Sequence, residues 1–290
     1  MLISVITCSI SKAKLALLQN SLLATTSCEY ELIVIDNSSN NYSICQAYNL
    51  GARKSKFDVL CFVHEDIEFL TPNWDQYLLG HLKEPDIALL GILGNTVKTI
   101  YPSGVYSPVL ESNRINQVQK LSDGSDQHYY INPLEEKRSE VATLDGMLLG
   151  TTKKYWEKAN FDEALLEGFH GYDVDFSLAM GQLGKVVVVY DILIAHSSFG
   201  GNNKTWIDNQ IKIVKKWRSH LPICKGAVSK KMLSERERAD LNDLMRSLLK
   251  LNSPFGISLK YAWLAIRKTP FQRINLHFIK KLFLKLVNAD

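Results

Sequence analysis

Cysteine is scarce in this sequence and never forms a paired motif. Five cysteines stand at positions 8, 28, 45, 61 and 224, and no C-x-x-C occurs. An odd number at irregular spacing favours free thiols over a disulfide framework. Cys8 and Cys61 also lie inside apolar runs, so we expect buried, reduced cysteines in a reducing compartment.

Long apolar runs and strong charge are missing as well. No window of about 18 residues is continuously apolar, and the N-terminal MLISVITCS has neither a basic leader nor the length of a signal sequence. The net charge of +4 is mild and argues against a dedicated nucleic-acid-binding protein. We therefore expect a cytoplasmic protein with no membrane span and no nucleic-acid partner.

The composition of the chain is that of an ordinary globular protein, since 46% of its 290 residues are apolar and 22% are charged. Short apolar runs alternate with amphipathic segments, which indicates an α/β fold with a mostly parallel sheet covered by helices on both faces. The strand-like runs are Leu2–Thr7, Glu31–Asp36, Asp58–Val63, Ile87–Leu93, Val141–Thr151 and Lys185–Ala195. The helical segments are 11–23, 42–54, 71–83, 153–158, 172–183 and 203–220.

Local signals set some of the expected boundaries. Thr71 and Pro72 predict a cap and a first-turn proline for the third helix. Gly184 predicts the end of the helix that begins at Tyr172. Between residues 95 and 140 the pattern fails, and a connection this long is usually functional or partly disordered.

Charged side chains gather where the apolar runs end. Residues 62–69 read FVHEDIEF, and charged groups avoid the end of a buried strand unless they are paired, exposed there or bound to a metal. In open α/β sheets, ligands bind beyond the carboxyl ends of the strands, so these residues predict a site. The candidates are Asp36, His64, Glu65, Asp66 and His196, together with Asp173 and Asp175 at a helix start.

Each candidate also has a plainer interpretation. Asp36 can simply begin an Asx-turn. Asp66 can be a solvated loop carboxylate, and His196 a structural histidine. Asp173 and Asp175 can be acids that favour the N-terminal end of a helix dipole.

Five segments in order resemble a family 2 glycosyltransferase with a GT-A fold over about residues 1–220. These segments are VITCS, ELIVIDNSS, YNLGARKSKFDVLCFVHEDIEF, GYDVD and AHSS. The resemblance is nearest to a bacterial subgroup related to streptomycin-biosynthesis transferase domains, whose metal motif reads H-x-D where most members have D-x-D. It implies a Rossmann-like mixed sheet with helices on both faces.

The resemblance also implies an activity. A hexosyltransferase-like enzyme would move a sugar from a nucleotide-diphosphate donor to a glycan or lipid-linked acceptor hydroxyl, with inversion, in bacterial glycan or polysaccharide synthesis. Because the leaving diphosphate is anionic, a divalent cation, Mn²⁺ or Mg²⁺, would neutralise it. The resemblance assigns Asp66 and His196 as ligands, with His64 as a third.

Further roles transfer in the same way. Asp36 would contact the nucleobase, Glu65 the ribose, and the end of the first strand, Thr7 to Ser9, the donor through its backbone. Asp173 would be the general base, with Asp175 as a rival. Two positions depart from the family pattern, since His64 and Tyr172 stand where the family usually has acids.

Two other classes stay open. A nucleotidyltransferase usually has a glycine-rich phosphate loop near its first strand, and residues 1–14 contain no glycine. Because the metal motif is altered, a non-catalytic nucleotide-sugar or carbohydrate-binding protein is the other alternative.

The composition changes after about residue 225, so we expect a transferase domain over 1–225 and a helical, basic extension over 226–290. On a helical wheel, one broad apolar face forms near the C-terminus opposite basic residues. This face either lies in an anionic membrane surface through residues 255–290, or packs on the protein or in a homodimer. Its members are Phe271, Phe278, Ile279, Leu282, Phe283 and Leu286.

Overall fold

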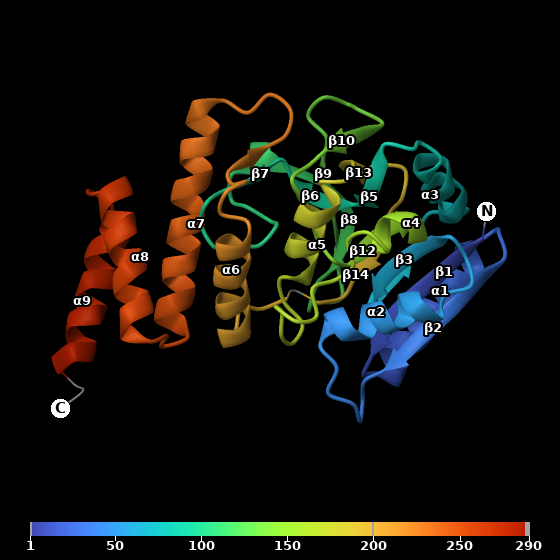
Figure 1. Cartoon of the computed structure of the whole chain (residues 1–290), viewed down its shortest axis with the longest axis horizontal. Helices are drawn as coiled ribbons and strands as arrows, with labels where there is room; N and C mark the ends of the chain where they lie inside the picture. Colours follow the sequence, from blue (N-terminus) through green and yellow to red (C-terminus); the bar gives the residue numbers. More distant parts are fainter. Residues whose placement is uncertain (1, 199, 288–290) are drawn as a thin grey trace.

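The structure is a computed structural model that describes residues 2–198 and 200–287, with side chains as far as Leu284 (Figure 1). Its helices are α1 (Lys12–Thr25), α2 (Ile44–Lys54), α3 (Trp74–Leu82), α4 (Lys153–Trp156), α5 (Tyr172–Met180), α6 (Lys204–Lys216), α7 (Lys230–Lys250), α8 (Phe255–Lys268) and α9 (Arg273–Val287). Its strands are β1 (Ile3–Ser9), β2 (Tyr30–Asp36), β3 (Val59–His64), β4 (Ile67–Phe69), β5 (Ile87–Gly91), β6 (Leu93–Asn95), β7 (Val97–Lys98), β8 (Asn113–Lys120), β9 (Asp126–Ile131), β10 (Arg138–Glu140), β11 (Thr143–Leu144), β12 (Leu148–Thr152), β13 (Lys185–Val189), β14 (Ile194–His196) and β15 (Ile223–Cys224).

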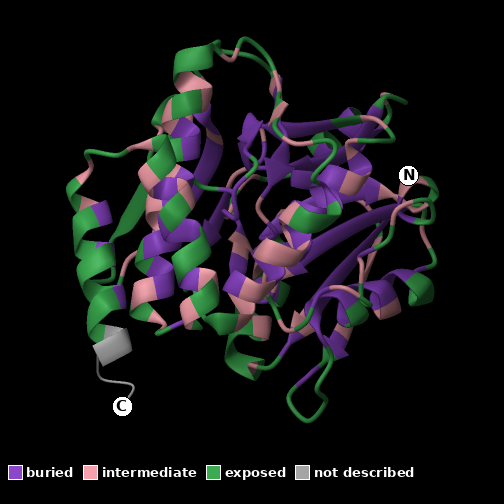
Figure 2. Cartoon of the chain, turned by 60° about the vertical axis from the view of Figure 1, so that its left-hand side comes forward, coloured by how far each residue is buried: buried purple, intermediate pink, exposed green. Residues whose placement is uncertain are grey.

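The main sheet has the strand order β10-β13-β5-β12-β3-β1-β2. β1 pairs in parallel with β2 and β3, whereas β12 runs antiparallel to β3. The expectation of a mixed α/β sheet is therefore confirmed. The residues of β3 from Val59 to Val63 are all buried, because both faces of the strand are covered. Figure 2 shows this pattern, with buried strands behind helices whose outer faces are exposed.

A second sheet has the order β11-β6-β8-β14-β4, with β9 paired to β8. The chain enters it directly from the main sheet, because β4 begins only two residues after β3 ends. Residues 64–67 therefore form the corner between the two sheets.

Three local expectations were wrong. Segment 95–140 is not irregular throughout, since it contains strands β7 to β10. Helix α3 begins after Asn73 rather than at Thr71, whose hydroxyl instead accepts a hydrogen bond from the Leu193 N–H at 2.8 Å. Helix α5 ends at Gly181, and Gly184 is needed for close packing, because a Cβ there would lie 2.7 Å from the Asp86 carbonyl oxygen.

The three C-terminal helices lie side by side at the end of the molecule away from the N-terminus (Figure 1). They share a second core, which includes Leu244, Leu248 and Tyr261 and also takes in Tyr101 and Ile207 from outside these helices. The division at residue 225 into two domains stays a prediction. Among residues 2–198 and 200–287, none of the helices is both long and apolar enough to cross a membrane.

The expectation of a single apolar face near the C-terminus was wrong. Phe278 and Leu282 are buried in the core of the C-terminal helices, whereas Phe271 and Phe283 are 99% and 64% exposed. The side chain of Leu286 lies outside the described residues. A helical wheel groups apolar positions by angle alone and cannot tell which of them a neighbouring helix covers.

A buried ionic cluster joins α7 to the segment after β7. Arg236 Nη1 lies 3.0 Å from Asp240 Oδ1, and the Thr99 hydroxyl donates to Asp240 Oδ2 at 2.5 Å. The neighbouring Lys98 ammonium donates to the Ser103 hydroxyl at 2.8 Å and to the Ser103 carbonyl at 3.0 Å. Each charge is paired or hydrogen-bonded, as buried charges must be.

We predict that Asp240→Ala destabilises the protein by about 3–5 kcal/mol, because it leaves the buried Arg236 without its partner. Chemical denaturation measures this change. The matched control is Asp243→Ala on the same helix, which breaks an exposed ion pair with Arg246 and should cost at most about 1 kcal/mol. Equal losses in the two variants would contradict the role given to the cluster.

Candidate functional site

The corner between β3 and β4 presents three polar side chains in a row. His64 ends β3, and Glu65 and Asp66 form the turn before β4. Glu65 is only 8% exposed, and its Oε2 accepts hydrogen bonds from the Ser9 hydroxyl and from the backbone N–H groups of Ile10 and Ser11, at 2.7, 3.0 and 2.9 Å. Glu65 thus ties the corner to the loop between β1 and α1.

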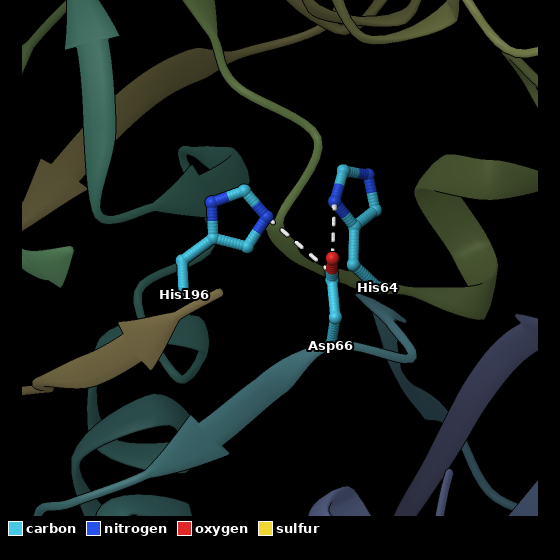
Figure 3. Close-up of side chains that lie close together, drawn as sticks. All are labelled: His64, Asp66 and His196. Carbon is cyan, nitrogen blue, oxygen red and sulfur yellow. Dashed lines mark ion pairs between the residues drawn. The ribbon is translucent and has the colours of Figure 1, made fainter. Parts of the chain in front are cut away.

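Strand pairing brings the distant His196 to the same corner. β14 runs antiparallel to β4 with His196 opposite Ile67, and the Ser197 N–H donates to the Asp66 carbonyl at 3.1 Å. As a result, His196 Nε2 lies 3.4 Å and His64 Nδ1 4.0 Å from Asp66 Oδ1 (Figure 3).

These three side chains fit a metal ion. Their ligand atoms all lie within 4.8 Å of one another. Two atoms each about 2.1 Å from one divalent ion are separated by roughly 3 Å at a right angle and about 4.2 Å when opposite, so the side chains would draw together slightly around an ion. One carboxylate with two imidazoles suits Mn²⁺ in particular, because it accepts both oxygen and nitrogen ligands. The other oxygen of Asp66, Oδ2, lies 3.3 Å from the Lys14 ammonium.

The electrostatics of the cluster keep Asp66 ionised. Burial alone would raise the pKa of Asp66, but the hydrogen bond and charge of His196 and the charge of His64 outweigh it and hold the pKa well below its usual range. Burial and the neighbouring His196 lower the pKa of His64. A charged carboxylate beside a neutral imidazole is the protonation state that binds a cation.

Asp173 and Asp175 occupy the first turn of α5 but have different surroundings. The carboxylate of Asp175 accepts from Trp217 Nε1 at 2.7 Å and from Lys216 Nζ at 2.8 Å, so it is held in a structural ion pair. Asp173 lines a cavity instead. Burial and the charge of Asp145 raise the pKa of Asp173 to about 7.

That cavity has a volume of about 820 Å³ and also reaches His64 and His196. Half-exposed aromatic side chains line it, together with Asp243 and Arg246 from α7. Two amides in its wall, Gln117 and Gln210, are 7% and 1% exposed, yet their Oε1 atoms accept no hydrogen bond within the described part of the chain. The aromatic side chains are those of Tyr106, Tyr129, Phe169 and Trp206.

A smaller cavity of about 450 Å³ lies between the loops that follow β1 and β2, and Phe169 lines both cavities. Asp36 ends β2 just before Asn37, which lines this smaller cavity. Asp36 does form an Asx-turn, because its Oδ1 accepts from the Ser38 N–H at 2.9 Å. Its contact with a nucleobase stays a prediction.

The other expected donor contacts are placed as follows. Thr7 lies inside β1, fully buried between β2 and β3, whereas Ser9 ends the strand and bonds to Glu65. Their contacts with a donor, and that of Glu65 with a ribose, stay predictions.

Comparison with known families decides the classification. A sequence model described as "Glycosyltransferase like family" matches residues 4–220, which is most of the chain. The chain belongs to this glycosyltransferase-like family. A search of curated proteins found no match.

A solved structure agrees with the fold of this glycosyltransferase-like protein. A crystal structure of GalNAc-T7 with UDP, GalNAc and Mn²⁺ superposes with a TM-score of 0.55 at 13% identity, covering 87% of this chain. The expected GT-A fold is therefore confirmed. The chain spans only 55% of the length of that transferase. A structure of A197 from STIV covers 68% of this chain and 85% of its own, with a TM-score of 0.40 and 12% identity.

The sequence analysis did not identify several residues of the site. Lys14 sits on a helix among other lysines and carries no distinguishing signal. Gln117 and Gln210 lie in segments without a motif, and Arg246 reaches the cavity only because α7 packs against it. Tyr172 was noted in the sequence only as a departure from the family pattern, without a role in the site.

We predict that Glu65→Ala lowers stability by about 1–3 kcal/mol, because it leaves the N–H groups of Ile10 and Ser11 without an acceptor. Thermal or chemical unfolding measures this. Glu68→Ala is the control, since Glu68 follows in the same segment but is paired with the half-exposed Lys120. A variant Glu65→Ala as stable as the control would refute the anchoring role.

Proposed function

We propose that the protein is a glycosyltransferase that moves a sugar from a nucleotide-diphosphate donor to a glycan acceptor, with inversion and with a divalent cation. One observation carries the proposal. A metal-competent cluster, His64–Asp66–His196, and a partly buried carboxylate with a pKa of about 7, Asp173, line or border the same cavity. This arrangement suits cleavage of a bond to an anionic leaving group and deprotonation of an incoming hydroxyl.

The donor would lie across the two cavities. We propose that the nucleoside occupies the smaller one, beside Asp36 and Asn37, with the ribose near Glu65 and the end of β1 at Thr7 and Ser9. The diphosphate would then reach the corner at Asp66. The solved GalNAc transferase contains UDP and Mn²⁺, which supports this class of donor and cofactor.

His64, Asp66 and His196 would hold the cation, either Mn²⁺ or Mg²⁺. When bound, it neutralises the diphosphate that leaves with the electron pair of the glycosidic bond. The Lys14 ammonium, 3.3 Å from Asp66, adds a positive charge at the same corner. The chain itself contributes by fixing the three ligands at the end of β3, in the turn before β4 and at the end of β14, which pairs with β4.

Asp173 would act as general base. Its carboxylate removes the proton of the acceptor hydroxyl while that oxygen attacks the anomeric carbon opposite the leaving diphosphate, so the configuration inverts. The pKa of about 7 places roughly half of Asp173 in the basic form at neutral pH. Asp175 is less suited, because Lys216 and Trp217 occupy its oxygens.

The larger cavity would hold the acceptor. Aromatic side chains pack against the apolar faces of sugars, and the unpaired Oε1 atoms of Gln117 and Gln210 can accept hydrogen bonds from hydroxyl groups. We therefore propose a glycan acceptor, free or lipid-linked, in bacterial glycan or polysaccharide synthesis. Helix α7 would form one wall of its site.

The outer helices suggest where the enzyme works. Residues 255–287 contain seven lysines and arginines and no acid, alongside exposed apolar side chains such as Trp263 and Phe283. We propose that α8 and α9 rest on an anionic membrane surface at the cytoplasmic face, because basic and apolar groups together match such a surface.

Turnover distinguishes the proposal from the alternatives. Purified protein is incubated with UDP-, GDP- and dTDP-sugars with and without Mn²⁺, and nucleoside diphosphate release is measured. A transferase should release it slowly and only with metal. Binding without release would indicate a non-catalytic binding protein, and release of pyrophosphate from a nucleoside triphosphate and a sugar phosphate would indicate a nucleotidyltransferase.

We predict that Asp66→Ala abolishes transfer and the Mn²⁺-dependent rise in melting temperature caused by a nucleoside diphosphate, because the central ligand is lost. His196→Ala should weaken the same stabilisation less severely. Differential scanning fluorimetry measures both. Wild-type metal-dependent stabilisation in Asp66→Ala would overturn the assignment of the site.

We predict that Asp173→Asn lowers kcat by roughly 10²–10⁴-fold with little change in donor affinity. Because Asp173 must be deprotonated, kcat of the wild type should rise with pH, pass half of its maximum near pH 7 and level off above that pH. Asp145 faces Asp173. The Val174 N–H donates a hydrogen bond to Asp173 Oδ1 at 2.9 Å. Removing the negative charge in Asp145→Asn should therefore move the rise in kcat to lower pH. An unmoved profile would show that another group titrates.

We predict that the full-length protein co-sediments with vesicles containing phosphatidylglycerol at low salt. Lys280→Glu/Lys281→Glu should reduce binding at least about tenfold, given roughly 1 kcal/mol per basic residue. The control is Lys54→Glu/Lys56→Glu, which alters exposed lysines on another part of the molecule. Equal binding of both variants, or concentration-dependent dimers that the first variant disrupts, would favour a protein interface.

A further inference from the structure

The two positions at which this chain departs from its family's acids contact one another. His64 Nε2 lies 2.6 Å from the Tyr172 hydroxyl, although the residues are 108 positions apart. The other ring nitrogen, Nδ1, faces Asp66 Oδ1. One histidine therefore joins the hydroxyl on one side and the metal-competent cluster on the other.

A cation bound at Nδ1 would fix the direction of this contact, since the 2.6 Å separation alone fits either donor. A neutral imidazole carries one proton, and only the nitrogen without it can donate its lone pair to a metal. When Nε2–H donates to the Tyr172 oxygen, Nδ1 is left unprotonated on the side of Asp66 and His196. A carboxylate at position 64 has no tautomers, so this constraint would not apply to it.

The surroundings of Tyr172 fix its hydroxyl in this place. A Cβ on Gly146 would lie 1.9 Å from the Tyr172 oxygen, so only glycine leaves room for it. The ring of Tyr172 is 4% exposed and packs edge-on against Tyr48, with centroids 5.6 Å apart, and against Phe161 at 6.0 Å. The hydroxyl can therefore act as a rigid support for His64.

We infer that Tyr172 is a positioning residue of the proposed metal site, which holds His64 in the orientation and tautomer that direct Nδ1 to the cation, with Gly146 as the space that admits its hydroxyl. This inference rests on the proposed function of the His64–Asp66–His196 cluster. It explains why a tyrosine accompanies a histidine here. Mutation of a residue that supports a metal-binding histidine typically lowers metal affinity by roughly 10–100-fold.

The test is direct Mn²⁺ binding, followed by the loss of the electron paramagnetic resonance signal of free Mn²⁺, in the presence of UDP. Tyr172→Phe should weaken binding about tenfold or more while the circular dichroism spectrum stays unchanged. Gly146→Ala should weaken it in the same direction, because it displaces the hydroxyl without removing it. Tyr155→Phe is the matched control, since its hydroxyl donates to the Pro85 carbonyl at 2.6 Å, away from His64 and Tyr172.

A double-mutant cycle separates positioning from a general structural effect. In a His64→Asp background, Tyr172→Phe should leave Mn²⁺ affinity unchanged, because a carboxylate needs no tautomer. An equal loss in that background, or an equal loss in Tyr155→Phe, would overturn the inference. Unchanged affinity in Tyr172→Phe would overturn it while leaving the metal site intact, whereas a wild type that binds no Mn²⁺ would refute the proposed function as well.

Discussion

The antiparallel pairing of β4 with β14 is the constraint on which the site depends. It places His196 opposite Ile67, and hence next to Asp66, across 130 residues of chain. Because β4 begins two residues after β3 ends, the same pairing also fixes His64. A shift of one residue in this register would turn His196 to the other face of the sheet. His196 would then no longer lie beside Asp66 and His64.

Two carboxylates in this protein acquire opposite properties from their surroundings. Asp66 lies beside His196 and His64, whose hydrogen bond and charges lower its pKa despite its burial, so it stays charged. Asp173 is partly buried beside Asp145, and desolvation and the charge of that acid raise its pKa to about 7. One environment suits a cation ligand and the other suits a proton acceptor, and such a separation is typical of enzyme sites that divide these tasks. Asp175, two residues from Asp173, shows that position on the helix alone does not decide the role.

The sequence allowed the main sheet and the location of His64, Asp66 and His196 at strand ends to be predicted, because buried strands are continuous apolar runs that end visibly. Strand β8 was not predicted. Its residues alternate poorly in polarity, since Gln117 faces a cavity rather than a core. The entry of α7 into that cavity and the contact between His64 and Tyr172 depend on long-range packing, which no local pattern encodes. The C-terminal apolar face was mistaken for a single surface because the wheel does not show that α9 is covered on one side.

The central claim is that the corner between the two sheets holds a divalent cation, and its most direct test is anomalous X-ray scattering from a crystal soaked in Mn²⁺. The account predicts an anomalous density peak within about 2.3 Å of Asp66 Oδ1, His196 Nε2 and His64 Nδ1. A peak at another site, with none at this corner, would contradict it.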